Sequence, residues 1–228
     1  MLTRIWKSKG LAATGQFLTT AFIYWGLAIL AWGLSHLNTF FMNPVRTGFT
    51  IIAVVQSLFM AWVVYVTPPH IEPEHRFDIP RWHAYLFETI FVLAAFSDQR
   101  DNPVWDENMP LRWTGTVIYL IGLALSVWTN TAWIGHLKRD GGHAQEIPVL
   151  TYEGPFRWIR YPSMVSLFFY CLGFTFMFRS WVGLALMPFL VWGIINRINN
   201  MEKIFEVRYK KIWPMRRHAS KRVIPYVY

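Results

Sequence analysis

The sequence predicts an all-α fold: a polytopic transmembrane helical bundle with about six membrane crossings, ending in a C-terminal helical hairpin and a cytoplasmic basic tail. Of the 228 residues, 54% are hydrophobic and only 15% are charged, a mixture too apolar for an ordinary soluble domain. The apolar residues gather in runs close to the ~20 residues that an α-helix needs to cross a bilayer. No internal repeat or low-complexity linker divides the chain, so residues 1–228 are expected to form a single integral membrane domain.

Residues 1–146 are expected to supply the first four crossings. Asn43–Pro44 makes the turn between the first two segments, which are both long enough to span. The third segment is short and contains His83 and Glu88, and it follows a loop at 67–81 that is rich in proline and charge. The four expected segments are Phe17–Phe41, Val45–Thr67, Trp82–Phe96 and Thr114–Ile134.

The remaining part, residues 147–228, is expected to contain a helical hairpin. Its helices are predicted at Pro162–Phe178 and Trp181–Ile198, with Arg179-Ser180 as a tight turn between them. From Asn199 onward apolar and basic positions alternate, which indicates a helix that continues out of the membrane and then a basic arm. Such a tail binds lipid headgroups or folds back as a cap.

The distribution of positive charge predicts the orientation. With the amino terminus inside and all six segments crossing, the inner segments carry three, two, four and nine Lys or Arg residues, and the outer ones carry one, two and one. Both termini are therefore expected in the cytoplasm, and the compact size favours a bacterial inner membrane. The formal charge of +9 indicates loops that face an anionic leaflet, and no soluble basic segment indicates nucleic-acid binding.

Several kinds of chemistry find little support in the residues. Cys171, the single cysteine, lies in an apolar run and excludes an intramolecular disulfide and a cysteine-based metal cluster. The seven histidines lack the close helical spacing of metal ligands, so no metal site is expected. Glu88 is an ionisable residue inside an expected crossing, a costly position that points to a functional or paired role. A position near the interface or a pairing with a histidine would also account for it.

The strongest constellation joins two segments at the base of the hairpin. Because the fifth and sixth helices run across the membrane and straight back, Arg157 and Arg160 before the hairpin must lie near Glu202 and Glu206 after it. The two arginines stand three residues apart, so both can face one side of a turn. Together these four side chains can recognise a zwitterion, or they can form salt bridges that lock the helix to the loop.

The same region resembles a known family. The run Gly154–Pro162, with sequence GPFRWIRYP, is similar to the signature G-P-Y-R-x-x-R-H-P of the integral-membrane isoprenylcysteine carboxyl methyltransferases and phospholipid methyltransferases. Further along the chain, Met201-Glu202, Tyr209, Trp213 and Ile224-Pro225 follow at matching spacing. The resemblance covers roughly Ile147 to Tyr228, about the last third of the chain.

The resemblance implies that S-adenosylmethionine binds near the cytoplasmic face, while a lipophilic acceptor or membrane lipid enters from the bilayer. Arg160 would pair with the charged end of the cofactor, and Glu202 would hold a hydroxyl or the ammonium group, which makes these two the expected catalytic pair. The chain departs from the family pattern at Tyr161, Met164, Ser166 and Met201. The implied cofactor-binding residues are Gly154, Arg157, Arg160, Tyr161, Pro162, Glu202 and Glu206.

Two other functions stay open. A homologue that keeps the fold without catalysis would act as a structural subunit, or as a lipid-binding component that associates with other membrane subunits. The ending VIPYVY also resembles the steroid 5-alpha-reductase group, which implies NADPH binding and a substrate-side role for the intramembrane residue Glu88. The identity of the methyl acceptor would depend on the first four crossings, where no motif stands out.

Overall fold

The computed structural model describes residues 2–67, 82–139, 151–210 and 213–222 of the chain. Within these ranges the elements are helices, joined by two isolated backbone pairings, Val104 with Ser180 and Ile159 with Lys221. The predicted loop at 67–81, apart from Thr67, lies outside the described residues, as does the terminal Ile224-Pro225. The all-helical class predicted from the sequence is confirmed for the described part.

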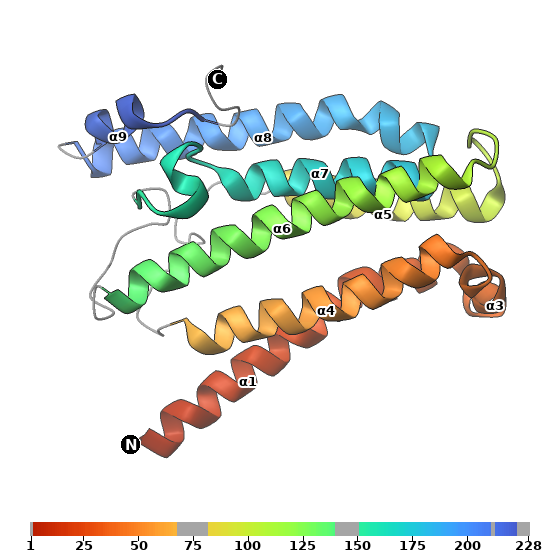
Figure 1. Ribbon diagram of the computed structural model, residues 1–228, viewed down its shortest axis with the longest axis horizontal. Helices are drawn as coiled ribbons and strands as arrows, with labels where there is room; N and C mark the ends of the chain where they lie inside the picture. The colour runs from red at the N-terminus through yellow and green to blue at the C-terminus, as the bar shows by residue number, and fades with distance from the viewer. Residues whose placement is uncertain (1, 68–81, 140–150, 211–212, 223–228) are drawn as a thin grey trace.

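The helices run back and forth along one axis, so that consecutive long elements point in opposite directions (Figure 1). The α-helices are α1 (Leu2–Ala21), α2 (Leu27–Trp32), α3 (Leu37–Phe41), α4 (Pro44–Val66), α5 (Trp82–Arg100), α6 (Met109–Arg139), α7 (Pro162–Met177), α8 (Trp181–Arg208) and α9 (Trp213–Ala219). The described chain also contains shorter helical turns. A π-helical turn, Phe22–Gly26, joins α1 to α2, and 3-10 turns lie before α3 at Leu34–His36 and before α7 at Gly154–Arg157.

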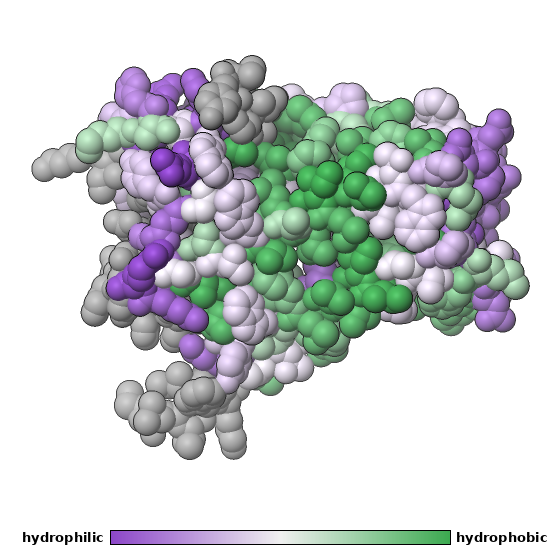
Figure 2. All heavy atoms as spheres, in the orientation of Figure 1, coloured by the Kyte–Doolittle hydropathy of each residue, from purple (hydrophilic) through white to green (hydrophobic). Residues whose placement is uncertain are grey.

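Four helical segments of the described chain are long and apolar enough to span a membrane: Lys9–Trp32, Pro44–Val66, Met109–Arg139 and Trp181–Arg208. Helix α7 is apolar but has only 16 residues. The visible face carries an apolar band in its middle, with hydrophilic side chains gathered toward its two ends (Figure 2). Length, composition and surface together are those of a membrane protein.

The first predicted crossing is the one whose bounds differ most. The apolar candidate span begins at Lys9 and ends at Trp32, whereas Phe17–Phe41 was expected. The helix ends there because Gly33 adopts a φ of 75°, a left-handed conformation that is open to glycine and that breaks the helical hydrogen bonding. The residues that follow form a short 3-10 turn and then α3, whose Phe40 ring packs edge-on against Trp32 at 5.3 Å between ring centroids.

The other predicted helices agree closely with the structure. Helix α4 begins one residue before the expected position because the side chain of Asn43 caps it, accepting hydrogen bonds from the backbone of Val45 and Arg46. Helices α5 and α6 extend the predicted segments by about one turn or more. Helix α8 continues unbroken to Arg208, with Pro188 inside it.

Helices α6 and α7 pack with their backbones almost in contact. A methyl group added at Gly115 would lie 2.6 Å from the backbone nitrogen of Met177, and one added at Gly173 would lie 2.8 Å from Cβ of Tyr119. Gly122 faces Phe169 and Ser166 at similarly short range. Small residues at such positions allow membrane helices to approach closely, so this pair forms the tightest contact of the fold.

Aromatic side chains fill the space between these helices and α4. Phe49, Phe91 and Phe174 are completely or almost completely buried, and the rings of Phe91 and Phe174 lie 4.6 Å apart between centroids. A polar contact crosses this core, because the side-chain amide of Gln56 donates to Tyr24 at 2.8 Å and accepts a hydrogen bond from Tyr119. Cys171 is also buried, as a packing residue would be.

One end of the bundle is held together by buried charges, which we call the Asp98 cluster. Asp98, at the end of α5, has no exposed side-chain surface. Arg112, in the first turn of α6, binds it through two nitrogens at 2.7 and 3.2 Å, and Arg179, between α7 and α8, donates at 3.2 Å. Arg46, in the first turn of α4, lies 3.4 Å away. One carboxylate thus connects four parts of the chain.

Two further acids complete the neutralisation of the Asp98 cluster. Glu107 accepts from Arg112 at 2.6 Å, and Asp101 accepts from Arg179 at 2.8 Å. Three buried arginines therefore face the buried Asp98 and two more exposed carboxylates, which together supply the compensating charge that buried cations require. The cluster consists of Arg46, Asp98, Asp101, Glu107, Arg112 and Arg179.

The half-exposed Glu107 gives this end of the protein a dependence on pH. Hydrogen bonds from Arg112 hold the pKa of the Glu107 carboxyl below its ordinary value of 4.5. Since the folded-state pKa is the lower one, the stability that Glu107 contributes is present above pH 4.5 and is lost as the pH falls through the folded-state pKa. The unfolding temperature should therefore fall less steeply below pH 4.5 in Glu107→Gln than in the unchanged protein. Equal slopes in a pH series of thermal unfolding would contradict this.

Candidate functional site

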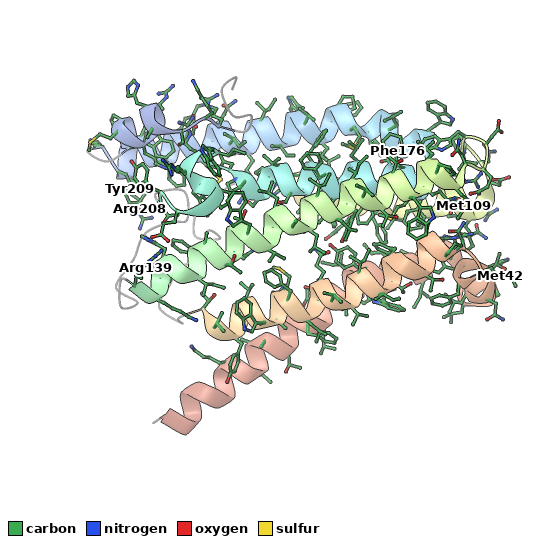
Figure 3. All side chains as sticks on the ribbon, in the orientation of Figure 1. Met42, Met109, Arg139, Phe176, Arg208 and Tyr209 are labelled. Carbon is green, nitrogen blue, oxygen red and sulfur yellow. The ribbon has the colours of Figure 1, made fainter. Side chains whose placement is uncertain are left out.

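The residues singled out by the sequence lie at the end of the bundle opposite the Asp98 cluster. Figure 3 labels Met42, Met109 and Phe176 near the Asp98 end, and Arg208 and Tyr209 at the other. Here the 3-10 turn, the start of α7, the end of α8 and the short helix α9 come together (Figure 1). The hairpin of α7 and α8 returns the chain to this end, as the sequence predicted.

The glycine of the family-like motif has a structural role in this arrangement. Gly154 adopts a φ of 55°, and a methyl group added there would lie 2.6 Å from Cβ of Ala132 on α6. Only glycine satisfies both the left-handed backbone and the close approach to α6. Pro155 then lies in the first turn of the 3-10 segment and Pro162 opens α7, each where a missing N–H is tolerated.

Arg160 and Glu202 form a buried ion pair. Nη2 of Arg160 lies 3.1 Å from Oε1 of Glu202, and both side chains are only 4% exposed. The second terminal nitrogen, Nη1, donates at 2.9 Å to the backbone carbonyls of Arg217 and Ser220. Burial lowers the pKa of Arg160, and the Glu202 carboxylate opposes that shift. The guanidinium is therefore tied to α8 on one side and to the end of α9 on the other.

The other carboxylate oxygen of Glu202 is held by the tail. Nη2 of Arg222 lies 2.6 Å from Oε2, and Nη1 of Arg222 donates to the side-chain oxygen of Asn199 at 3.4 Å. Glu202 is thus the centre of a line of charges, with Arg160 at one oxygen and Arg222 at the other.

Backbone hydrogen bonds hold the tail against the motif. The amide of Arg160 donates to the carbonyl of Lys221 at 2.8 Å, and the amide of Tyr161 donates to Arg222 at 3.2 Å. In return, the amide of Lys221 donates to Trp158 at 3.1 Å. The chain after α9 therefore runs parallel to residues 158–161 and covers the ion pair.

Helix α9 packs back onto the bundle through two buried side chains. Trp213 is 1% exposed and Arg216 is fully buried. Arg216 donates to the carbonyl of Phe156 and lies 4.5 Å from the ring of Tyr152, and burial lowers its pKa to about 10. Through these two side chains α9 lies against the segment that precedes α7.

Two buried donors beside the ion pair have no hydrogen-bond partner among the described residues. These are Nε of Arg160 and Nε1 of Trp213, whose ring centre lies 5.8 Å from the guanidinium carbon of Arg160. The Oε1–Nη2 contact of Glu202 is an ion pair by distance without hydrogen-bond alignment, so this oxygen also keeps a free lone pair. Buried unsatisfied groups of this kind suit a ligand or a water with matching polar atoms.

A groove of about 570 Å³ lies next to the Arg160–Glu202 pair, between the end of α8 and α9, and Trp213 forms part of its wall. Across it, Glu206 accepts from Arg217 at 2.8 Å, and both side chains are about half exposed. Its lining combines an aromatic ring, an acid and several basic groups, which suits an amphoteric ligand. The lining residues are Glu206, Lys210, Trp213, Pro214, Arg217 and His218.

The structure does not bring all the predicted site residues together. Arg157 is exposed, whereas Arg160 is buried, so the two do not share a face although they stand three residues apart. Tyr161 directly precedes α7 without a capping side-chain hydrogen bond, and it is 2% exposed. Glu88 is half-buried in α5, on a helix that the site does not use.

The remaining departures from the family motif lie in the protein interior. Met164, Ser166 and Met201 are buried, and the hydroxyl of Ser166 donates to the carbonyl of Pro162. Sequence reasoning missed Arg222 and Arg216, whose only signal was their place in the basic tail. No group of three or more His, Cys, Asp or Glu side chains among the described residues is placed to hold a metal ion.

Comparisons of the chain with protein-family models, with curated proteins and with solved structures found no match.

Proposed function

We propose that this protein transfers a methyl group from S-adenosylmethionine to a lipophilic acceptor at the cytoplasmic face of a bacterial inner membrane. The observation that carries the proposal is the contact of Arg160, from the GPFRWIRYP motif, with Glu202, from beyond the hairpin, at 3.1 Å. Two residues that the family resemblance pairs in one site, but that lie 42 positions apart, meet beside a groove and two unused donors.

The chemistry of the cofactor suits these groups. Its amino-acid end carries a carboxylate and an ammonium group, which match a guanidinium and a carboxylate respectively. Arg160 would bind the carboxylate, with the indole N–H of Trp213 as a second donor, and Glu202 would bind the ammonium group or a ribose hydroxyl. Glu206 lies on the groove wall, where it can take the other of these two groups.

Methyl transfer makes modest demands on the protein. A lone pair of the acceptor forms a bond to the methyl carbon, the bond from that carbon to the sulfonium sulfur breaks, and the sulfur leaves as a neutral thioether. A carboxylate acceptor needs no general base. Holding the two reactants in line and excluding water supplies most of the acceleration, so a triad or a metal is unnecessary.

The proposed topology has six crossings with both termini in the cytoplasm. Helices α5 and α7 would cross together with the four longer apolar segments, because all six run along the same axis of the bundle. The excess of Lys and Arg on the side of Arg160 supports this orientation. Exposed tryptophans near opposite ends, Trp158 and Trp181 among them, suit the two headgroup regions. A lipid acceptor would reach the site from the inner leaflet.

A second candidate function, a non-catalytic subunit of a larger membrane complex, is favoured by a different observation. Arg160 and Glu202 are both almost fully buried and already bonded within the protein. In that case the pair would serve only to lock the tail to α8. The partners would be other membrane subunits, and the protein would not bind S-adenosylmethionine.

Binding of S-adenosylmethionine to the detergent-purified protein, measured by titration calorimetry, distinguishes these functions. Saturable binding is expected, and Glu202→Gln should weaken it at least ~10-fold because a charge-assisted hydrogen bond contributes about 1.5–3 kcal/mol. The matched control is Glu153→Gln at the same end of the molecule, where the acid pairs with Arg139 and His136. The control should bind like the unchanged protein.

The opposite result has a clear meaning. If the folded protein binds no cofactor at millimolar concentration, the methyltransferase proposal is wrong, and co-purifying membrane subunits would support the second candidate. Saturable binding of NADPH instead, weakened by Glu88→Gln, would support the reductase-like alternative.

A further inference from the structure

The last described segment, Arg217–Arg222, contacts both halves of the Arg160–Glu202 pair, and we call it the tail strap. Two strap carbonyls, of Arg217 and Ser220, accept from Nη1 of Arg160 at 2.9 Å. The guanidinium of Arg222 lies 2.6 Å from Glu202. The strap thus presents acceptor oxygens to the arginine and a cation to the glutamate.

A zwitterionic ligand would present the same two kinds of group. Its carboxylate oxygens would take the place of the strap carbonyls at Arg160, and its ammonium group would take the place of the Arg222 guanidinium at Glu202. Both sets of partners cannot occupy the same nitrogen and oxygen atoms at once. The strap and such a ligand are therefore competitors for one pair of side chains.

The contacts of the strap among the described residues are local to this end of the bundle. Besides these side-chain bonds, three backbone hydrogen bonds join Lys221 and Arg222 to residues 158–161. Arg222 also donates to Asn199 at 3.4 Å, and the Arg217 side chain donates to the half-exposed Glu206 at 2.8 Å. Lys221 is exposed. The strap begins in the last turn of α9, a helix of seven residues, rather than in a spanning helix. Opening the strap breaks these bonds at the end of the bundle and none of the hydrogen bonds within the spanning helices.

We propose that the tail strap is an autoinhibitory occupant of the Arg160–Glu202 pair, which a cofactor carrying a carboxylate and a cation must displace in order to bind. This inference rests on the proposed function and adds a regulatory step to it. The apparent affinity for the cofactor is then the intrinsic affinity multiplied by the fraction of molecules with an open strap. Any change that opens the strap raises the apparent affinity.

The test compares three variants in calorimetric titrations with S-adenosylmethionine. Arg222→Ala removes the cation that competes for Glu202, so it should tighten binding about 10-fold or more. Lys221→Ala is the matched control, because it removes one positive charge from the same strap without touching Glu202. It should bind like the unchanged protein. Arg222→Lys keeps the charge but loses the second nitrogen, which reaches Asn199, so its affinity should lie between those of the unchanged protein and Arg222→Ala.

Amide hydrogen exchange of the unchanged protein gives a second readout that does not depend on a variant folding. The amides of Arg160, Tyr161 and Lys221 donate the backbone bonds that close the strap. Saturating cofactor should make these three amides exchange faster, while those of the spanning helices keep their protection. A tail with a purely structural role would be stabilised by the ligand and would exchange more slowly.

The outcomes separate this inference from the function on which it rests. If the unchanged protein binds the cofactor while Arg222→Ala binds equally or more weakly, and the strap amides gain protection, the strap is not a competitor although the methyltransferase proposal stands. If neither the unchanged protein nor Arg222→Ala binds, both proposals are overturned. Both proposals are supported if Arg222→Ala binds the cofactor more tightly than the unchanged protein, Lys221→Ala does not, and the strap amides exchange faster in the presence of cofactor.

Discussion

Replacing Asp98 by alanine is expected to lower the free energy of unfolding by about 3–5 kcal/mol, the largest effect of any single substitution considered. The carboxylate is fully buried and pairs with Arg46, Arg112 and Arg179. Its removal leaves the buried Arg112 with the half-exposed Glu107 as its remaining acid, and leaves Arg46 without an acid partner among the described residues. The loss is large because uncompensated buried cations remain, and not because the ion pairs themselves are strong.

The measurement is denaturant-induced unfolding in detergent micelles, followed by tryptophan fluorescence. Asp101→Ala is the matched control, since Asp101 pairs with Arg179 in the same cluster but is 77% exposed. Exposed pairs contribute about 0–1 kcal/mol, so the control should change stability little. Similar losses in the two variants would show that burial of Asp98 does not decide the stability of this end.

The second large effect is expected from Gly173→Val, which should destabilise the protein by about 3 kcal/mol. An added Cβ at Gly173 would lie 2.9 Å from the carbonyl oxygen of Gly115 and 2.9 Å from the backbone nitrogen of Tyr119. Backbone atoms cannot rotate away as the end of a flexible side chain can. Helices α6 and α7 would have to separate, and the aromatic core beneath them would lose contacts.

Gly135→Val provides the comparison, because nothing lies within 4 Å of a Cβ added at Gly135, which is also on α6. In an α-helix, valine is at least as favourable as glycine, so this control should be neutral or slightly stabilising. The same unfolding experiment applies. A loss in Gly135→Val as large as that in Gly173→Val would mean that helix propensity, and not the α6–α7 contact, determines the effect.

The helices could be predicted because long apolar runs and their capping residues act locally. Asn43 before Pro44 predicted the start of α4 to within one residue, since the cap depends only on its own neighbours. The first helix was misplaced because its end is set by the backbone of Gly33, and a lone glycine in an apolar run does not reveal its φ angle. The apolar run itself continued past that position.

The Asp98 cluster escaped prediction because its members come from four separate turns of the sequence. A signal was nevertheless present: Arg46, Arg112 and Arg179 are three of the four basic residues on the expected outer side, where positive charge is disfavoured. Arginines in such positions need acidic partners. The distribution of arginines indicated that acidic partners were needed on this side, but only the fold showed that Asp98 is the shared partner.

The candidate site could be predicted in part. The return of the α7–α8 hairpin brought Arg160 to Glu202, because two antiparallel neighbours joined by a tight turn must end at the same level. The direction of Arg157 could not be predicted, since the segment is a 3-10 turn without helical periodicity. The position of Arg222 depends on how the chain folds back after α9, which no local pattern encodes.

The glycine contact between α6 and α7 also limits where the molecule can move. Backbones in contact through Gly115, Gly122 and Gly173 have no rotamers to rearrange, so these two helices behave as one rigid body. The backbone of Tyr209 leaves the helical conformation where α8 ends, so the chain can bend at this residue without separating α6 from α7. Bending at that residue would occur on the nanosecond-to-microsecond timescale of loops and termini, which is faster than the collective opening of a helical bundle.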